Sequence, residues 1–89
     1  VKHTRLGIPV FTVAEALHGS VHEGSTITAE IALASTFNPE LAYRRAAEIS
    51  KELHYQGICQ ILAPCIDVVR DLRWGRVEES YGEDPFLNG

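Results

Sequence analysis

The sequence contains no long apolar run, no cluster of basic residues and no methionine. No apolar stretch approaches the roughly 20 residues of a membrane-spanning helix, and no basic segment followed by an apolar one opens the chain, so we expect neither a membrane span nor a signal peptide. The formal net charge is −4 at pH 7, which offers no electrostatic attraction for nucleic acid or a membrane surface. With 45% hydrophobic residues, the composition is that of a globular protein.

The absence of methionine extends to the first position, which is Val1. Together with the end at Gly89 and the lack of a closing element, this start indicates a piece of a longer protein. A processed or trimmed chain gives the same pattern, so the sequence leaves both origins open.

Cysteine is scarce, with Cys59 and Cys65 as the only two. They lie on one predicted strand, where a rise of roughly 3.3 Å per residue separates them by about 20 Å. Bridged cysteines have α-carbons within roughly 7 Å of each other, so this pair is not expected to form a disulfide. Two unpaired thiols leave the redox compartment undetermined.

Motifs for cofactors and metals are also missing. The glycines form neither a G-x-G-x-x-G nor a P-loop pattern, so nucleotide binding has no support. His18 and His22 are four residues apart, but the order is not H-E-x-x-H, and Gly19 and Ser20 interrupt a helix between them. We therefore expect no metal site and no cofactor.

Two apolar segments rich in β-branched residues are predicted to be strands. Residues 7–13 (GIPVFTV) form a short run with proline near its beginning, and residues 58–69 (ICQILAPCIDVV) form a second run. The second is too uniformly hydrophobic to leave one face in water, so it is expected to be buried on both sides.

Two helices are predicted between these strands. The spacing of apolar residues indicates a short helix over residues 26–37 and a longer one over residues 39–56. The longer helix has Asn38 as its N-cap, Pro39 at its first position and Gly57 as its stop. A strand, a helical crossover and a second strand make a βαβ unit, so we predict an α/β fold with a parallel sheet.

Polar residues follow both predicted strands. The segment EALHG (15–19) follows the first strand, and the segment RDLRWGRVEESYGEDP (70–85) follows the second. The carboxyl ends of parallel strands share one edge of a sheet, so the two segments should lie on the same rim. Within the second segment, arginines and carboxylates surround Trp74 and can orient one another, which favours a structured site loop over a solvated surface run.

Three segments carry a resemblance to a known family. In order they are RLGIPVFTVAEALHG (5–19), TITAEIALASTFNPEL (26–41) and GICQILAPCIDVVRDLRWGRVEESYGEDPFL (57–87). They resemble successive parts of the N-terminal barrel domain of family-3 glycoside hydrolases, the β-glucosidases and β-xylosidases. Leu72 stands where the family usually has proline, and ITAE at 27–30 replaces a usual Phe-Pro-Gln-Ala, which bears on where the first helix begins.

The resemblance implies an incomplete (β/α)8 TIM-like barrel in which residues 1–89 are one part of the N-terminal domain. A barrel of this kind usually needs roughly 250 residues. The chain then holds about a third of a barrel and depends on the remainder of the parent chain to cover its apolar faces.

The resemblance also implies roles for single residues. Arg76 matches a position that donates hydrogen bonds to sugar hydroxyls in the nonreducing-end subsite, and Glu15 matches an acidic position that accepts hydrogen bonds from hydroxyls of the same sugar. These roles suit a guanidinium, which only donates, and a carboxylate, which only accepts. Supporting roles in the loops are expected for His18, Asp67, Asp71, Arg73 and Trp74.

No catalytic residue is expected within the chain. The carboxylates of the EESYGED segment, Glu78, Glu79, Glu83 and Asp84, form tempting pairs for a retaining mechanism, which needs two carboxyl groups roughly 5 to 5.5 Å apart. In the family the nucleophile, the acid/base and a Lys-His pair all lie further along the chain. The carboxylates here are better interpreted as loop braces and a helix start.

The expected parent is an exo-acting, retaining β-glycosidase that removes glucose from nonreducing ends, and the chain alone should be inactive. A β-xylosidase of the same family, a non-catalytic sugar-binding barrel and a flavodoxin-like α/β domain stay open as alternatives, because a βαβ pattern alone does not define a function. Family habit weakly favours an extracytoplasmic location.

Overall fold

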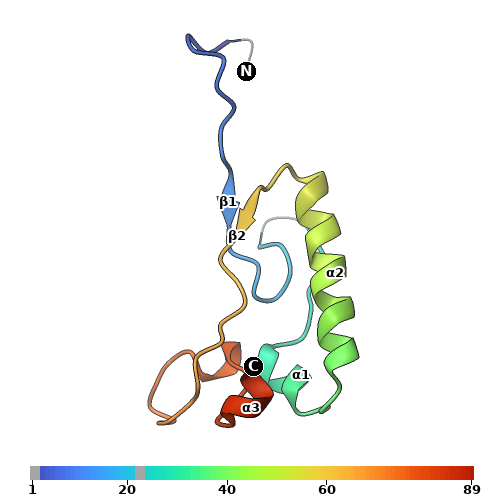
Figure 1. Cartoon of the computed structure of the whole chain (residues 1–89), viewed down its shortest axis with the longest axis vertical. Coiled ribbons are helices and arrows are strands. Elements are labelled where there is room, and N and C mark those ends of the chain that lie inside the picture. Colours follow the sequence, from blue (N-terminus) through green and yellow to red (C-terminus); the bar gives the residue numbers. More distant parts are fainter. Residues whose placement is uncertain (1–2, 22–23) are drawn as a thin grey trace.

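The structure, a computed structural model, describes residues 3–21 and 24–89. The chain is elongated, with principal extents of 49 × 25 × 21 Å. Figure 1 shows an extended N-terminal segment leading into two short strands, with a long helix alongside them and short helices gathered at the opposite end. The strands are β1 (Val13–Ala14) and β2 (Gln60–Ile61), and the helices are α1 (Glu30–Ala34), α2 (Pro39–Tyr55), the 3-10 helix η1 (Val77–Glu79) and α3 (Pro85–Asn88).

The two strands are parallel, with Val13 opposite Gln60 and Ala14 opposite Ile61. The amide of Leu62 continues the ladder by donating to the carbonyl of Ala14 at 3.0 Å. Because α1 and α2 lie between the strands in sequence, the chain forms the predicted βαβ unit. This is an α/β fold with a two-stranded parallel sheet, which by itself is not a closed barrel.

The predicted strand lengths, 7–13 and 58–69, are wrong. Of these segments, only Val13 and the pair Gln60–Ile61 lie in the paired strands, since a strand extends only as far as its partner supplies hydrogen bonds in register. Residues 7–12 carry no strand assignment, and the second segment leaves the sheet just before Pro64, which has no amide hydrogen to donate.

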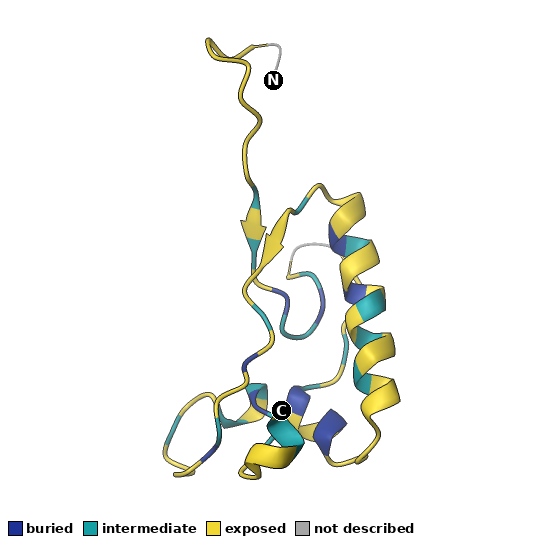
Figure 2. Ribbon diagram, viewed as in Figure 1, coloured by how far each residue is buried: buried dark blue, intermediate teal, exposed yellow. Residues whose placement is uncertain are grey.

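The expectation that residues 58–69 are buried on both sides is also wrong for this structure. Leu62 is 51% exposed and Ile66 is 64% exposed. Figure 2 shows exposed residues along most of the extended chain and on much of the strand pair. Since a sheet of two strands has open edges and little to cover its faces, apolar side chains that the sequence marks as core remain in contact with solvent.

Helix α2 confirms the prediction of a long helix over residues 39–56. The Asn38 side chain accepts a hydrogen bond from the amide of Glu40 at 3.1 Å, and Pro39 occupies the first turn. At the other end Gln56 is the C-cap and Gly57 adopts φ +76°, a conformation that favours glycine. Between these signals the helix presents Ile49 and Leu53 to the core.

The core is small and lies between α2 and the loop after β1. Ala16, Ile49 and Leu53 are buried together, and Ile27 and Ile58 pack against them. The loop that carries the EALHG segment therefore rests directly on α2. No helix of the described residues is long and apolar enough to cross a membrane.

The first predicted helix, 26–37, is shorter in the structure. Residues 26–29 are not helical, and Ala29 is an extended N-cap without a side-chain hydrogen bond. At the other end the helix stops at Ala34 with Ser35 as its C-cap, and Phe37 adopts φ +50° in the turn that follows. The five residues that remain in α1 bury Glu30, Leu33 and Ala34, and α1 contacts η1.

Candidate functional site

The loop after β1 and the segment around η1 line an open cavity of about 360 Å³. Its walls are formed by Glu15, Leu17, His18, Val21, Arg76, Glu78 and Glu79. Three residues singled out from the sequence, Glu15, His18 and Arg76, thus face one space although about 60 positions separate the first from the last. The rule that polar residues after parallel strands share an edge predicts this meeting.

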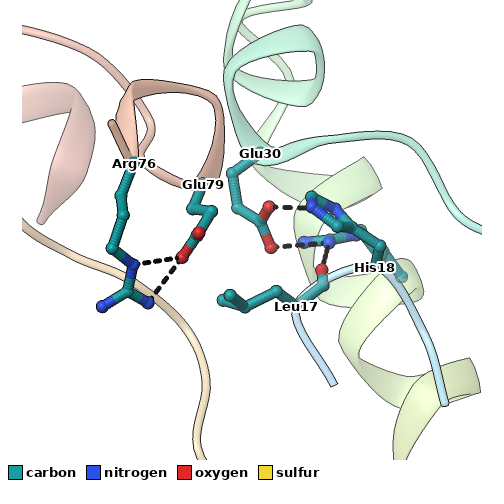
Figure 3. Close-up of polar contacts among 6 residues, drawn as sticks. Leu17, His18, Glu30, Arg76 and Glu79 are labelled. Atoms are coloured by element: carbon teal, nitrogen blue, oxygen red, sulfur yellow. Dashed lines mark hydrogen bonds and ion pairs between the residues drawn. The ribbon is translucent and has the colours of Figure 1, made fainter. Parts of the chain in front are cut away.

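Arg76 is oriented by Glu79, as Figure 3 shows. Its Nε and Nη2 lie 2.7 and 2.5 Å from Glu79 Oε2. Because η1 is a 3-10 helix with about three residues per turn, the side chain three positions after Arg76 returns to the same side. Glu79 occupies only part of the five-donor guanidinium, so N–H groups of Arg76 remain for a ligand.

The charges in this cavity affect one another. Hydrogen bonding from Arg76 lowers the pKa of Glu79, and the same contact raises the pKa of Arg76. The field of Glu15 adds weakly to the increase in the Arg76 pKa. At neutral pH the cavity therefore presents a fixed cation with carboxylates around it, which suits a neutral ligand rich in hydroxyl groups.

The Glu15–His18 loop takes its shape from close contacts with later segments. The carbonyl of His18 accepts a hydrogen bond from the amide of Ile27 at 3.0 Å. Gly19 adopts φ +94°, and a β-carbon at this position would collide with the carbonyl oxygen of Ser25. Only glycine fits this turn without displacing the backbone.

Two charged residues that the sequence analysis did not identify lie beneath this loop, the buried Glu30 and the partly buried Arg45. Arg45 Nη2 of α2 donates to Glu30 Oε1 of α1 at 2.6 Å and also to the carbonyl oxygen of Leu17. Glu30 Oε2 lies 3.5 Å from His18 Nδ1 (Figure 3). No spacing rule links positions 30 and 45 across two helices. The only hint of this contact in the sequence was that residues 27–30 depart from the family pattern.

Of the predicted supporting residues, only His18 lines the cavity, and Asp71, Arg73 and Trp74 form a separate cluster. Asp71 accepts hydrogen bonds from the amide of Arg73 at 2.9 Å and from its guanidinium, and the Trp74 amide donates to the Asp71 carbonyl at 3.0 Å. The Arg73 contact lowers the pKa of Asp71. Since the Arg73 side chain is 91% exposed, this cluster is a local brace of the loop.

Asp67 links the segment after β2 to the end of η1. Its carbonyl oxygen accepts a hydrogen bond from the hydroxyl of buried Ser80, and its carboxylate accepts one from the thiol of Cys65 at 3.3 Å. Burial, followed by the effect of Asp67, raises the pKa of Cys65. Cys59 and Cys65 are both free, as the sequence predicts.

Two of the four carboxylates of the EESYGED segment act as the expected brace and helix start. Glu79 braces Arg76, and the Asp84 side chain caps α3 by accepting from the amide of Phe86 at 2.8 Å. Within residues 3–21 and 24–89, no group of three or more His, Cys, Asp or Glu side chains could hold a metal ion. His22, considered with His18 as a metal ligand, lies outside the described residues.

An α/β chain with a cavity lined by carboxylates and an oriented arginine is the kind of structure that sugar-processing enzymes use. The model of the glycosyl hydrolase family 3 N-terminal domain matches residues 1–88, and the chain belongs to this family. The family resemblance carried by the three sequence segments is thus confirmed.

The chain is similar to proteins named for two related activities. It is 42% identical over 90 residues to a β-xylosidase of Formosa agariphila, covering 93% of this chain and 12% of that protein. It is 38% identical over 85 residues to a periplasmic β-glucosidase of Salmonella typhimurium, covering 94% of this chain and 11% of that protein.

A solved structure shares the fold. A β-glucosidase from Erythrobacter marinus matches with a TM-score of 0.88 and 36% sequence identity, over 98% of this chain and 12% of that one. The chain thus spans about one eighth of the length of such proteins.

Proposed function

We propose that the chain is part of the N-terminal barrel domain of an exo-acting, retaining β-glycosidase that hydrolyses β-glucosides from their nonreducing ends. The observation that carries this proposal is the meeting of Glu15 and Arg76 at one cavity in a chain of this family. The names of the similar proteins support the substrate class, since they are glucosidases and xylosidases.

The two side chains provide complementary recognition of a sugar. Arg76 donates hydrogen bonds to the oxygens of hydroxyl groups, and Glu15 accepts hydrogen bonds from other hydroxyls of the same ring. A sugar hydroxyl both donates and accepts, so a cavity with one donor wall and one acceptor wall fixes the orientation of the ring. Glu79 contributes by holding the Arg76 guanidinium in place.

The bond-breaking carboxylates are assigned to parts of the protein outside this chain. Glu79 is engaged by Arg76, and such a contact keeps it ionised and turned towards the guanidinium. The role proposed for the chain is binding and orientation of the sugar at the nonreducing-end subsite. A retaining reaction then proceeds through a covalent glycosyl-enzyme formed on a residue elsewhere.

The barrel itself is proposed from the parallel β1–β2 pair and its helical crossover. A (β/α)8 barrel repeats this unit, and its active site lies at the carboxyl ends of the strands. Glu15 directly follows β1, which agrees with that location.

A β-xylosidase is the second candidate, and the similarity to the Formosa protein favours it. Both activities share the mechanism and the Arg76 contact. They differ in whether the cavity accommodates the hydroxymethyl group of glucose.

Replacing Arg76 by alanine in the full-length protein tests the proposal. We expect kcat/KM for an aryl β-glucoside or β-xyloside to fall at least about tenfold, because hydroxyl groups of the bound sugar lose a charged donor. Arg44→Ala is the matched control, since Arg44 is an exposed arginine of α2 paired with Glu40. Near-native kcat/KM in a folded Arg76→Ala protein would contradict the proposed role, and an arginine that only stabilises the fold would lower the melting temperature instead.

A further inference from the structure

A charged pair lies directly behind the wall of the cavity, with Glu30 buried and Arg45 partly buried. The Glu30 side chain is 1% exposed and the Arg45 side chain 9% exposed, and they meet at 2.6 Å. Neither residue lines the cavity, yet both contact the loop that does, through Leu17 and His18. From this geometry we infer that Glu30 and Arg45 are positioning residues that set where Glu15 and His18 stand in the cavity.

Stability alone is a weak explanation for this pair. Removing two charges from water costs several kcal/mol for each ion, and apolar residues of similar volume often serve the fold equally well. What apolar residues do not supply is a directed donor for a backbone carbonyl. Arg45 Nη2 supplies that donor to Leu17, two positions after Glu15. The contact therefore fixes the backbone close to the carboxylate proposed to accept sugar hydroxyls.

The second carboxylate oxygen of Glu30 extends the same contact to the cavity wall. Oε2 faces Nδ1 of His18 at 3.5 Å, and both atoms are buried without a hydrogen bond among the described residues. His18 is held between this carboxylate and its own backbone bond to Ile27. The orientation of the His18 ring in the cavity wall thus depends on where Glu30 is held, and Arg45 holds Glu30.

Helix α2 also fixes the far end of the loop. Glu52 accepts hydrogen bonds from the amide of Ser25 at 3.2 Å, and Gln56 accepts one from the hydroxyl of Ser20 at 2.8 Å. Positions 45, 52 and 56 are seven and four residues apart, so they share one face of the helix. Of these attachments, Arg45 is the one that reaches the backbone between Glu15 and His18.

Arg45 also influences the segment that follows η1. Burial raises the pKa of Tyr81, and the interaction with Arg45 partly offsets that increase. One guanidinium thus contacts both the loop after β1 and helix α1, and its charge acts on Tyr81. The inferred role goes beyond sugar contact, because it concerns how the loop that carries Glu15 is held in place.

The test is made in the full-length protein and rests on the proposed glycosidase function. We expect Glu30→Gln and Arg45→Lys each to raise KM for an aryl β-glycoside about tenfold with a smaller change in kcat, the size typical of losing a residue that orients a binding group. Glu40→Gln and Arg44→Lys are the control pair, because the same residue types form an exposed contact of 3.0 Å on the same helix. These controls should leave KM unchanged.

A double-mutant cycle separates positioning from general stability. If Arg45 acts through Glu15, then Arg45→Lys should add little to the increase in KM already caused by Glu15→Gln. A purely structural role predicts that the two effects multiply. Should the single variants unfold, the doubly substituted Glu30→Met and Arg45→Met protein removes both charges at similar volume, and it should fold but keep the raised KM.

Hydrogen–deuterium exchange of residues 15–19 provides a readout without catalysis. Arg45→Lys should speed exchange in this segment, and Arg44→Lys should not. Unchanged exchange and unchanged KM, in a protein whose hydrolysis still depends on Arg76, would overturn the positioning role and leave the proposed function standing. Absence of glycoside hydrolysis in the unsubstituted protein would overturn the proposed function, and the exchange experiment would still decide the role of Arg45.

Discussion

At the scale of single residues, the carboxylate that orients Arg76 is not the carboxylate that is proposed to bind the ligand. Arg76 is held by Glu79 from its own turn, and Glu15 approaches from the loop after β1. If Glu15 paired directly with Arg76, each would satisfy the other and leave less for a ligand. Because a third residue holds the arginine, the carboxylate of Glu15 and part of the guanidinium stay open to a ligand.

The sequence predicts some of these residues and not others, for a physical reason. Glu15 and His18 follow β1, Arg76 follows the second predicted strand, and the edge of a parallel sheet collects such residues. Glu30 and Arg45 lie on different helices, and their meeting depends on how α1 and α2 pack against the loop. Local pattern carries no information about that packing, so their role emerges only from the three-dimensional structure.

Glu15 provides a prediction about which sugar is preferred. In the proposed subsite, glutamate would place its carboxylate one methylene further than aspartate, towards the region expected to hold the hydroxymethyl group of a glucoside. We expect Glu15→Asp in the full-length protein to raise the ratio of kcat/KM for an aryl β-glucoside to that for an aryl β-xyloside. The change should be modest, because one methylene in a pocket discriminates by roughly 1 to 3 kcal/mol. An unchanged ratio would mean that Glu15 does not contact that part of the sugar.

At the scale of elements, η1 is a single turn that brings Glu79 back to Arg76. With about three residues per turn, a 3-10 helix places side chains three positions apart on the same side. The Ser80 hydroxyl then ties the end of η1 to the carbonyl of Asp67. The sequence marks this segment as a structured loop, but it does not reveal that a 3-10 turn orders it.

The Arg76–Glu79 contact predicts how sugar binding depends on pH. The pKa of Glu79 lies below its ordinary value of 4.5 because Arg76 hydrogen-bonds to the ionised form. A carboxyl whose pKa is lowered keeps its contact above the ordinary value and loses it as the pH falls through the lowered one. We therefore expect the inhibition constant of the released sugar to stay flat as the pH is lowered to about 4.5 and to rise only below that value.

Glu79→Gln is the control for this pH effect. Glutamine does not ionise, so sugar binding should already be weaker at neutral pH, and the acidic rise should be smaller than in the unsubstituted protein. A rise that begins well above 4.5 in the unsubstituted protein, or an identical profile in both, would show that another group controls binding.

Helices and strands differ in how far the sequence predicts them. The limits of α2 agree with Asn38 and Gly57 because a cap and a stop act through the adjacent backbone. The strands at 7–13 and 58–69 were predicted too long because a strand requires a partner that local sequence does not specify. The apolar character of these segments indicates burial, and the structure supplies too few neighbours to provide it.

At the scale of the whole molecule, the chain is more extended than a compact domain. Its radius of gyration is 15.8 Å, whereas a compact chain of this length has a value of about 12 Å. Large apolar side chains lie in solvent, among them Val10 at 78%, Phe37 at 77% and Phe86 at 92% exposure. The apolar surface and the unpaired strand edges are what a barrel domain would cover with further strands and helices.

The exposed apolar surface leads to a prediction for the 89 residues produced alone. We expect this chain to be poorly soluble or to melt without a cooperative transition, because unpaired parallel strands and uncovered apolar faces favour association over a single packed state. Sedimentation velocity at several concentrations, together with calorimetry, measures both properties, and the full-length protein is the reference. A monomer with a sharp melting transition at a temperature independent of concentration would contradict the prediction. Such a result would mean that the small core around Ala16, Ile49 and Leu53 is sufficient to hold the chain, and the segment would then be an autonomous domain.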